Sequence, residues 1–594
     1  MEYSEIFSCR SDISIVRKET FLHLKRKHST NFIEGDVRMG NIIIFSLIAG
    51  LSASLLLIPF SNSKEESKRL TPAALISLII LIVASVFLFY YVTSFDRNLS
   101  SLWIFAIFIT LLGSLLSSGK ERLIKGVLFF ASLFLGVYFM TAFLFNADDK
   151  YEMAKMKVET EIEVFSESET PASVPPKFAR NKMKKSFGQV PNTSYYELGR
   201  LQIQKVDGKY VYIAPVEFSG FFKWLNGKST PGYFTISATD STANPKFIKA
   251  DMVYTPSSYF NKNIERHIRM QYPEEIFYGD VQLEIDDNGK PYYIRTYGSF
   301  VSARNGFEMK GIVAVDPKNG DTKQYPLAKV PEFIDGAVSP EAVSLQNSYF
   351  GNYIHGFWNS KFGKRDVKLP SDEGTESNVS PIFDEKGVMY YFTDFTSPKE
   401  GVDSMLGYSL TNSRTGEAIY YTGNLEESYM DSQGALQIIE KKFIEKKWEG
   451  EMPILYNFYG EASWLTAVLD SNGFLQNYFI VSAANPEISV YGNTPNEALK
   501  QYKTALQKGG GTVDGTSKAE EKQTSGTVLR VYKEKYGEYT LVSFLLDNME
   551  NYIVSSENSP LSIYLKEGDH VTVTFLNTGE EFLPVKKLSI KGFE

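Results

Sequence analysis

Cysteine is almost absent from this sequence of 594 residues, and histidine is scarce. The single cysteine, Cys9, cannot form an intrachain disulfide, so the fold is not a disulfide scaffold. The five histidines include no His-Glu-x-x-His arrangement, and no Cys/His set has zinc-ligand spacing. A Walker loop, a dinucleotide fingerprint and a Gly-x-Ser-x-Gly elbow are also missing. We therefore expect no cofactor, no metal and no catalytic residues.

An excess of basic charge is missing too. The chain has 62 Lys and Arg against 70 Asp and Glu, which gives a net charge of -8. Proteins that bind nucleic acid usually show a basic face, so nucleic acid is not an expected partner. Hydrophobic residues make up 43% of the chain, which is ordinary for folded domains, and the length allows several of them.

Long apolar stretches are present and crowd residues 41–146. They run over Asn41–Phe60, Pro72–Thr93, Ser101–Ser117 and Leu123–Phe145. Each is close to the ~20 residues that a helix needs to cross a ~30 Å hydrocarbon core. The sequence therefore predicts four transmembrane helices, with the lipid bilayer as a partner of the chain.

The orientation of these helices depends on where translation begins. Residues 1–40 form a basic tail, which would hold the N-terminus in the cytoplasm. Glu34-Gly35-Asp36 can be encoded as a purine-rich ribosome-binding sequence, so we hypothesise a start at Met39. Positive charge then lies in the first and third loops, which places both termini outside. On this basis we expect a multi-pass protein of the cell membrane with an extracytoplasmic soluble domain.

Residues 147–196 have the composition of a stalk or linker. Glutamates alternate with Ser and Thr before Val174-Pro175-Pro176, and a short basic helix is expected over Lys177–Phe187. This segment is either a solvated connector or a basic face that contacts anionic lipid headgroups.

Residues 197–507 contain internal repeats. An Asp-x-x-Gly turn followed by an aromatic strand occurs at 286–289 and 384–387, and a second turn follows each at 316–320 and 412–416. The closing glycines of the two copies are 98 and 96 residues apart, and a weaker third copy has its turn at 470–473. Asp/Asn-Gly is a common tight-turn signal, and the glutamate that closes a calcium loop is missing.

A helix is predicted ahead of the strands of each copy. The predicted helices are Ser257–Met270, Ser339–Ile354 and Ser432–Trp448, followed by a closing helix, Thr494–Leu506. Ser257 and Ser339 are the expected N-caps of the first two. A helix combined with antiparallel hairpins predicts a two-layer α+β module.

One turn supports a family resemblance. Val315-Asp316-Pro317-Lys318-Asn319-Gly320 resembles the terminal Val-Asp-x-x-x-Gly hairpin of the PepSY family, and residues 412–416 match it less well. The resemblance covers about Pro256–Leu506, and other phrases are similar to a family of bacterial multi-pass membrane proteins. It implies tandem non-catalytic modules of the kind found in protease propeptides and in membrane-anchored regulators of cell-wall hydrolases.

The C-terminal part of the chain divides into two segments. Residues 508–525 are rich in Gly, Ser, Glu and Lys and are expected to be a flexible linker. Residues 526–594 contain short strands that predict a small OB-like or SH3-like β-barrel. Such a fold does not by itself identify a ligand.

The expected function is binding. The sequence predicts a cell-envelope membrane protein whose soluble domain is a non-catalytic binding or regulatory module for another envelope protein. The alternatives are a peptidoglycan- or glycan-acting enzyme with an unrecognised carboxylate site, and a membrane transport or assembly subunit. Aromatic clusters fill cores more often than grooves. The candidate partner groove consists of Phe222, Trp224, His355, Phe357 and Trp358.

Overall fold

The computed structural model describes residues 99–160, 174–509 and 520–593, apart from 273–274, 302–305, 374–376, 385, 400, 424–427, 537–538, 557–558 and 578–581, together with residues 52, 55–57, 76, 79–80 and 82–84. Most of the first two predicted spans, the tail 1–40 and most of the linker 508–525 lie outside these residues. The described chain mixes helices and sheets, with a closed barrel near the C-terminus and one long apolar helix.

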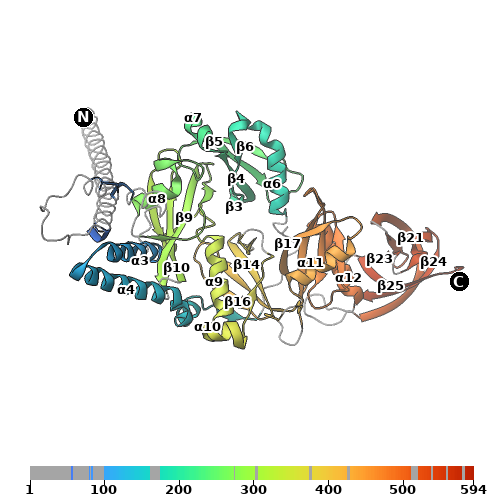
Figure 1. Ribbon diagram of the computed structural model, residues 1–594. Helices are drawn as coiled ribbons and strands as arrows, with labels where there is room; N and C mark the ends of the chain where they lie inside the picture. The colour runs from blue at the N-terminus through green and yellow to red at the C-terminus, as the bar shows by residue number, and fades with distance from the viewer. Residues whose placement is uncertain are drawn as a thin grey trace, which may run out of the picture.

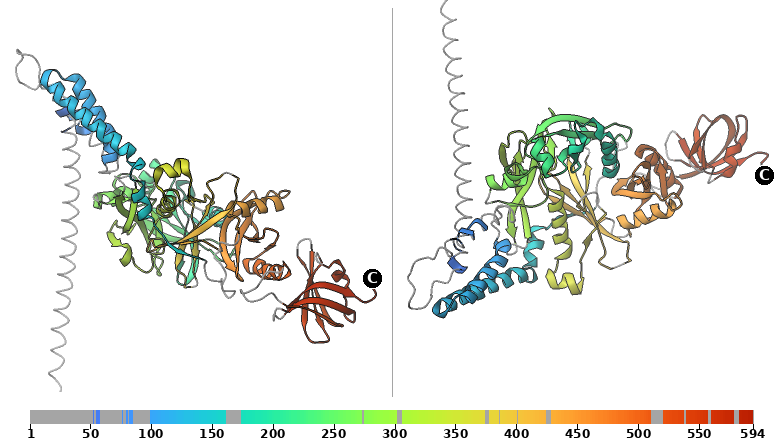
Figure 2. Two further views of the ribbon diagram at one scale, coloured as in Figure 1. Left: turned by 90° about the horizontal axis from the view of Figure 1, so that it is seen from below. Right: turned by 45° about the horizontal axis from the view of Figure 1, so that its top comes forward.

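The N-terminal helices form an antiparallel pair at one end of the molecule (Figures 1 and 2). The pair consists of α3 (Leu99–Leu116) and α4 (Gly119–Thr141), which continues into η2 (Ala142–Leu144). Among the described residues, one helix, Gly119–Leu144, is long and apolar enough to cross a membrane, with a mean hydropathy of 2.2. The apolar part of α3, Ile104–Leu116, is shorter. Lys125 of α4 pairs with Glu121 one turn earlier at 2.7 Å and donates to Ser117 in the connection from α3, so its charge is satisfied at the start of α4.

Four units with a common plan follow. Each has a helix followed by four rows of antiparallel strand, which we name units A to D. Unit A comprises α6 (Pro176–Lys185), β2 (Tyr196–Leu198), β3 (Gln202–Val206), β4 (Lys209–Phe218), α7 (Phe221–Gly227), β5 (Thr230–Ser237) and β6 (Lys246–Met252). Unit B comprises α8 (Ile264–Gln271), β7 (Ile276–Phe277), β8 (Gln282–Ile285), β9 (Pro291–Val301), β10 (Gly306–Val315) and β11 (Thr322–Pro326).

The other two units repeat this order. Unit C comprises α9 (Pro340–Asn352), α10 (Gly356–Trp358), β12 (Leu369–Pro370), β13 (Ser380–Phe383), β14 (Met389–Thr396), β15 (Met405–Asn412) and β16 (Ala418–Tyr421). Unit D comprises α11 (Ser432–Lys442), β17 (Glu449–Phe458), β18 (Glu461–Leu469), β19 (Leu475–Ser482), β20 (Ser489–Gly492) and α12 (Pro495–Gly509).

The first row of the sheet is interrupted in the same way in three units. β2 and β3 both pair with β4, β7 and β8 both pair with β9, and β12 and β13 both pair with β14. In unit D this row is the single strand β17, which carries an irregularity between Glu451 and Ile454. The described chain therefore holds four copies of one plan, where the sequence predicted two clear copies and a weaker third.

The predicted turns have the expected geometry. Gly289 and Gly387 have φ of 76° and 77°, a region that favours glycine, and each N–H donates to the carbonyl of the aspartate three residues earlier at 2.8 Å. Gly473 is the same, with φ of 75° and a 2.8 Å bond to Asp470. However, this third turn joins the second and third rows of unit D, whereas the first two join the first and second rows. Its assignment as an equivalent of the other two was wrong.

The predicted helices differ from the observed ones mainly at their starts and ends. Ser339 is the N-cap of α9, as predicted, and its Oγ accepts from the N–H of Ala342. The helix predicted from Ser257 instead begins at Ile264, because the side chain of Asn263 accepts from the N–H of Arg266 and caps α8.

The segment expected to be a stalk is largely packed against the units. Phe178, Ala179 and Met183 of α6 are buried in a core with the sheet of unit A. Further upstream, α5 (Ala147–Met153) contacts α9, and β1 (Lys157–Glu159) pairs in parallel with β16. Residues 174–196 are therefore part of unit A, and residues 147–159 extend unit C. Although α6 is rich in basic residues, its apolar side chains form one face, and that face packs on the sheet of unit A.

The barrel lies at the opposite end of the molecule from α3 and α4 (Figure 2). It comprises β21 (Glu520–Tyr536), β22 (Tyr539–Leu546), β23 (Asn551–Ser555), β24 (His570–Asn577) and β25 (Phe582–Ile590). The strands close in the order β21-β22-β23-β25-β24 around a core that includes Val542, Tyr552 and Val585. This confirms the predicted small barrel.

Candidate functional site

The first half of the predicted groove lies in an exposed aromatic cluster on α7. The ring of Phe221 lies 5.0 Å from that of Tyr259 and 5.9 Å from that of Trp224, measured between centroids. Trp224 in turn lies 5.7 Å from Phe260. Although these rings pack together, much of the cluster faces solvent. We call it the α7 patch, and its members are Phe221, Phe222, Trp224, Leu225, Tyr259 and Phe260.

The second half lies around α10, at the end of the apolar helix. Phe357 packs edge-to-face on Phe143 of η2 with 4.9 Å between ring centroids, so this ring is used structurally. Trp358 stacks on Phe362, and both are exposed, at 57% and 78%. His355 lies 2.8 Å from the carboxylate of Asp366, in a pair that is open to solvent.

The structure separates the two halves of the predicted groove. In Figure 1, α7 lies at the top of the molecule and α10 at the bottom. Phe222 and Trp224 therefore belong to one patch, and His355, Phe357 and Trp358 belong to another. The prediction of a single groove was wrong, because local sequence does not tell how far apart two aromatic segments lie in the fold.

Sequence reasoning missed a set of buried carboxylates that hold the connections between units. Glu217 of β4 accepts from the N–H and hydroxyl of Ser257, ahead of unit B. Glu284 of β8 accepts from the N–H of Gly336 at 3.0 Å, ahead of unit C. The signal was present, since each acid stands in a strand that is otherwise buried and mostly apolar.

The same arrangement recurs at the last connection. Asp394 of β14 accepts from the N–H of Ser432, the first residue of α11 in unit D. Each of the three connections between units is thus held by a carboxylate of the preceding sheet. These groups are buried, and they accept the backbone hydrogen bonds that the connections would otherwise leave unmade.

Burial changes the acidity of these groups. Desolvation raises the pKa of Glu217 and of Glu284, and the nearby charge of Asp335 acts in the same direction on Glu284. Desolvation also raises the pKa of Asp335 and that of Asp394, each to about 6. Asp335 and Asp394 are therefore partly protonated near pH 6.

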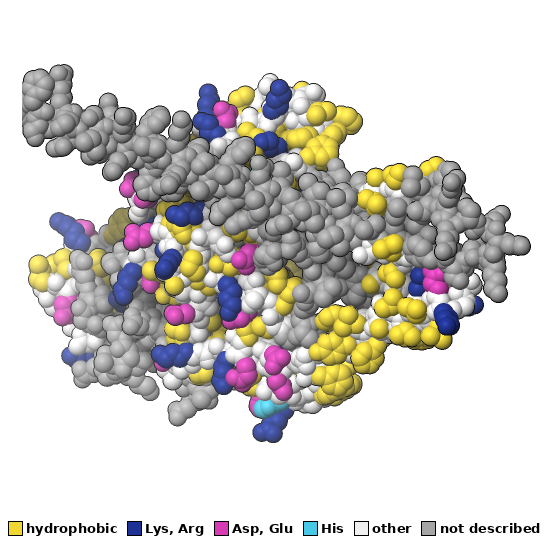
Figure 3. Space-filling model, turned by 90° about the vertical axis from the view of Figure 1, so that its left-hand side faces the viewer, with side chains coloured by type: hydrophobic (Ala, Val, Ile, Leu, Met, Phe, Trp, Pro, Cys, Tyr) yellow, Lys and Arg dark blue, Asp and Glu magenta, His cyan; other side chains and the backbone are white. Residues whose placement is uncertain are grey.

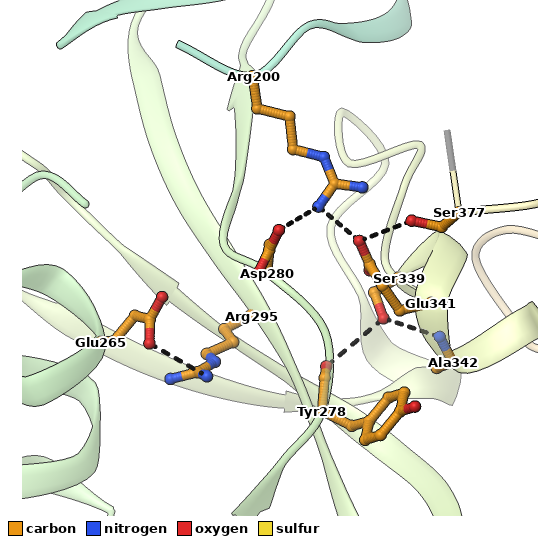
Figure 4. A network of polar contacts seen from close by, with 9 residues as sticks. All are labelled: Arg200, Glu265, Tyr278, Asp280, Arg295, Ser339, Glu341, Ala342 and Ser377. Atoms are coloured by element: carbon orange, nitrogen blue, oxygen red, sulfur yellow. Dashed lines mark hydrogen bonds and ion pairs between the residues drawn. The ribbon is translucent and has the colours of Figure 1, made fainter. Parts of the chain in front are cut away.

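Side chains of three units meet in a partly buried polar network (Figure 4). Arg200 of unit A lies 2.6 Å from Glu341 of unit C and 3.1 Å from Asp280 of unit B. Ser377 donates to the same carboxylate of Glu341 at 3.1 Å. Ser339 donates weakly to the carbonyl of Tyr278 at 3.4 Å, which adds a second link between units B and C.

A small cavity lies beside this network. It measures about 50 Å³, which allows a few water molecules but not a metabolite. Its lining includes Arg200, Gln202, Tyr212, Met389 and Tyr391. Within the described part of the chain, no group of three or more His, Cys, Asp or Glu side chains could hold a metal ion.

Comparison with known proteins identifies no family. No protein-family model matches the sequence, and no curated protein matches it. Among solved structures, one described as a "BT0996 RGII" complex covers 63% of this chain and 94% of its own length, at 9% identity and a TM-score of 0.17. A "Glycoside hydrolase" gives the same identity and coverage with a TM-score of 0.18. The Nup133 β-propeller domain of Vanderwaltozyma polyspora gives 0.13. Since these scores are far below 0.5, they establish no common fold.

Proposed function

We propose that this chain is a multi-pass membrane protein of the cell envelope whose units A to D form a non-catalytic binding module. The α7 patch is its docking surface for another envelope protein. The observation that supports this proposal is that the apolar side chains of the patch are exposed to solvent. Phe222 is 76% exposed and Leu225 is 53% exposed, and the neighbouring Tyr259 and Phe260 are partly exposed. Contiguous exposed apolar patches mark interaction sites, and aromatic residues are enriched in them.

The membrane anchor rests on α4 together with the sequence. Only 11% of the most apolar window of Gly119–Leu144 is buried, so its hydrophobic surface needs a cover that the described residues do not supply. The four apolar stretches of residues 41–146 would supply a helix bundle in the bilayer. The distribution of Lys and Arg in the loops supports an extracytoplasmic position for the units.

The PepSY resemblance supports a regulatory partner. Units B and C each have a helix ahead of an antiparallel sheet, with the turns 316–320 and 412–416 between the last two rows. The partner would then be a protease or a cell-wall hydrolase. The buried carboxylates described above accept backbone hydrogen bonds, so they do not favour the alternative of a glycan-acting enzyme.

Site-specific crosslinking tests the docking surface. Benzoylphenylalanine is placed at Phe222 in the full chain, and irradiation is carried out in the native membranes. The control position is Met549, which is 72% exposed and lies in the barrel. We expect a protein adduct from position 222 that is lost in the Phe260→Ser variant. No adduct, or equal adducts from both positions, would contradict the proposal.

Cysteine accessibility tests the orientation. Single cysteines at Ser61, Asn98 and Ser525 are introduced into a Cys9→Ser background and treated with a membrane-impermeant maleimide on intact cells. The proposed topology predicts labelling at Asn98 and Ser525 but not at Ser61. Labelling at Ser61 alone would place the units in the cytoplasm.

A further inference from the structure

We propose that residues 355–365 of unit C form a peripheral membrane contact. In it, Trp358 and Phe362 enter the headgroup region of the bilayer, and Lys361, Lys364 and Arg365 lie on anionic headgroups. This inference rests on the proposed insertion of α4 in the membrane. It goes beyond that proposal by adding a second lipid contact. This contact would set the orientation of units A to D relative to the bilayer surface. We call residues 355–365 the α10 segment.

The position of the α10 segment supports this assignment. It contacts η2 and α5, the two elements through which the chain leaves the apolar helix. Phe357 packs on Phe143 at 4.9 Å, and Phe145, two residues further on, is 73% exposed. The segment therefore lies at the level where Gly119–Leu144 ends, which is where an inserted helix would pass from hydrocarbon to headgroups.

The exposed side chains of the segment suit that level. Trp358 and Phe362 stack at 5.9 Å between centroids and leave 57% and 78% of their surface uncovered. Aromatic residues, tryptophan above all, are enriched at membrane–water interfaces. Figure 3 shows the side of the molecule on which α3 and α4 lie, and hydrophobic side chains gather at the lower right of this face.

Within residues 355–365 the Lys and Arg side chains have no Asp or Glu beside them in the sequence of the segment itself. Lys361, Lys364 and Arg365 are exposed and follow within seven residues of Trp358. The acidic group facing them is Asp366, which is already paired with His355 and Arg365. The neighbouring α5 adds two exposed acids, Asp148 and Asp149. A basic cluster beside exposed aromatic rings is typical of segments that lie in the membrane interface.

Contacts between α5 and unit C fix the α10 segment relative to the rest of unit C. Lys150 of α5 is buried, and its ammonium lies 5.3 Å and 5.4 Å from the ring centres of Tyr349 and Tyr353 in unit C. Tyr151 stacks on Phe350 of α9. The end of the apolar helix, α5 and the α10 segment are thus joined to unit C on one side of the molecule (Figure 1).

Lipid quenching tests the contact in the full chain. The protein is reconstituted into phosphatidylcholine vesicles with or without phosphatidylglycerol, and a nitrobenzoxadiazole label is placed on single cysteines in a Cys9→Ser background. Spin-labelled lipids carry the quencher either near the headgroup or in mid-chain. Phe362→Cys reports the α10 segment, Phe134→Cys reports α4, and Phe222→Cys is the control, since Phe222 is also 76% exposed but lies on α7.

We expect the label at 362 to be quenched by the headgroup-level spin label about twofold more than the label at 222. Phosphatidylglycerol should increase this quenching, and the Lys361→Glu/Lys364→Glu variant should abolish the increase. Quenching at 134 but not at 362 would overturn this inference and leave the anchor intact. No quenching at 134 would overturn the anchor itself. A label at 362 that is unquenched in vesicles but shielded in native membranes would mean a protein occupant, which also overturns the lipid contact.

Discussion

The carboxylate of Asp394 accepts a hydrogen bond from the backbone N–H of Ser432 at 3.0 Å, across the connection from unit C to unit D. The carboxylate is fully enclosed, so its negative charge is held only by local dipoles. The pairs formed by Glu217 with Ser257 and by Glu284 with Gly336 do the same at the other two connections. We therefore expect the stability of the units to respond to pH at these joints.

The Asp394→Asn variant should remove part of the pH dependence of the free energy of unfolding. Since the pKa of Asp394 rises from 3.8 to about 6 on folding, its contribution to stability is complete below about pH 4 and is lost as the pH rises through about 6. The amide oxygen of asparagine can still accept the hydrogen bond from the N–H of Ser432, but the asparagine side chain cannot ionise. Between about pH 4 and pH 7 the variant should gain about 2 kcal/mol in free energy of unfolding relative to the wild type.

Urea unfolding of the detergent-solubilised chain, followed by tryptophan fluorescence, measures this difference. The matched control is Asp251→Asn, which replaces an exposed aspartate on β6. Because that carboxylate is not enclosed, its removal should change the free energy of unfolding less than Asp394→Asn does. Parallel pH curves for the wild type and Asp394→Asn would show that Asp394 carries no excess proton in the folded chain.

Removal of Glu284 should loosen the connection ahead of unit C. Its carboxylate accepts from the amide of Gln202 at 2.6 Å and from the N–H of Gly336, and both donors would lose their partner in Glu284→Ala. Buried donors without partners predict a loss of about 2–4 kcal/mol. Glu284→Gln retains an acceptor and should lose less. Hydrogen exchange over residues 330–338 should speed up in the alanine variant, and unchanged exchange there would refute the assigned role.

The ion pair between Arg200 and Glu341 should couple units A and C. Both side chains are about one-fifth exposed, so solvent screens the pair less than it screens a surface pair. A double-mutant cycle with Arg200→Met and Glu341→Gln should give a coupling of about 1 kcal/mol. The control cycle is Arg530 with Glu567 in the barrel, at 77% and 54% exposure, which should give less than about 0.5 kcal/mol. Equal couplings would mean that the junction adds nothing to an ordinary surface pair.

The turn at residues 286–289 should depend on glycine. Gly289 has φ of 76°, so Gly289→Ala should cost about 1 kcal/mol of folding free energy. Gly188→Ala is the control, because a Cβ there would meet open space and its φ is not in the left-handed region. The difference between the two unfolding midpoints checks the prediction. Equal effects would remove the conformational argument for the repeated turns.

Features set by neighbouring residues could be predicted from the sequence. The Asp-x-x-Gly turns and the Ser339 cap depend on contacts within a few residues, and both were found. Unit A was partly missed because its first hairpin closes with the two-residue turn Asp207-Gly208, which does not match the longer repeat. The basic composition of α6 also concealed the apolar face that packs on the sheet.

Features set by distant residues could not be predicted in this way. Ser257 was expected to cap a helix, but its hydroxyl and N–H are engaged by Glu217, 40 residues away. The split of the predicted groove into the α7 patch and the α10 segment likewise depends on how units A and C are placed. The three connections held by Glu217, Glu284 and Asp394 could not be predicted either, because each acid and the backbone N–H that it accepts from are far apart in the sequence.

The parallel pairing of β1 with β16 has a mechanical consequence. Lys157–Glu159 follows α5, just after the apolar helix, yet it pairs with β16, the last strand of unit C. The chain therefore returns to its starting point after passing through units A and B and through the rest of unit C. Tension applied between the barrel and the anchor would therefore travel through unit D, unit C and the β1–β16 edge. Units A and B, which carry the α7 patch, lie in the loop of chain that this pairing closes, and side-chain contacts such as Arg200 with Glu341 hold them against unit C. Tension between the barrel and the anchor would therefore reach a partner on the α7 patch only through these side-chain contacts, and not along the chain itself.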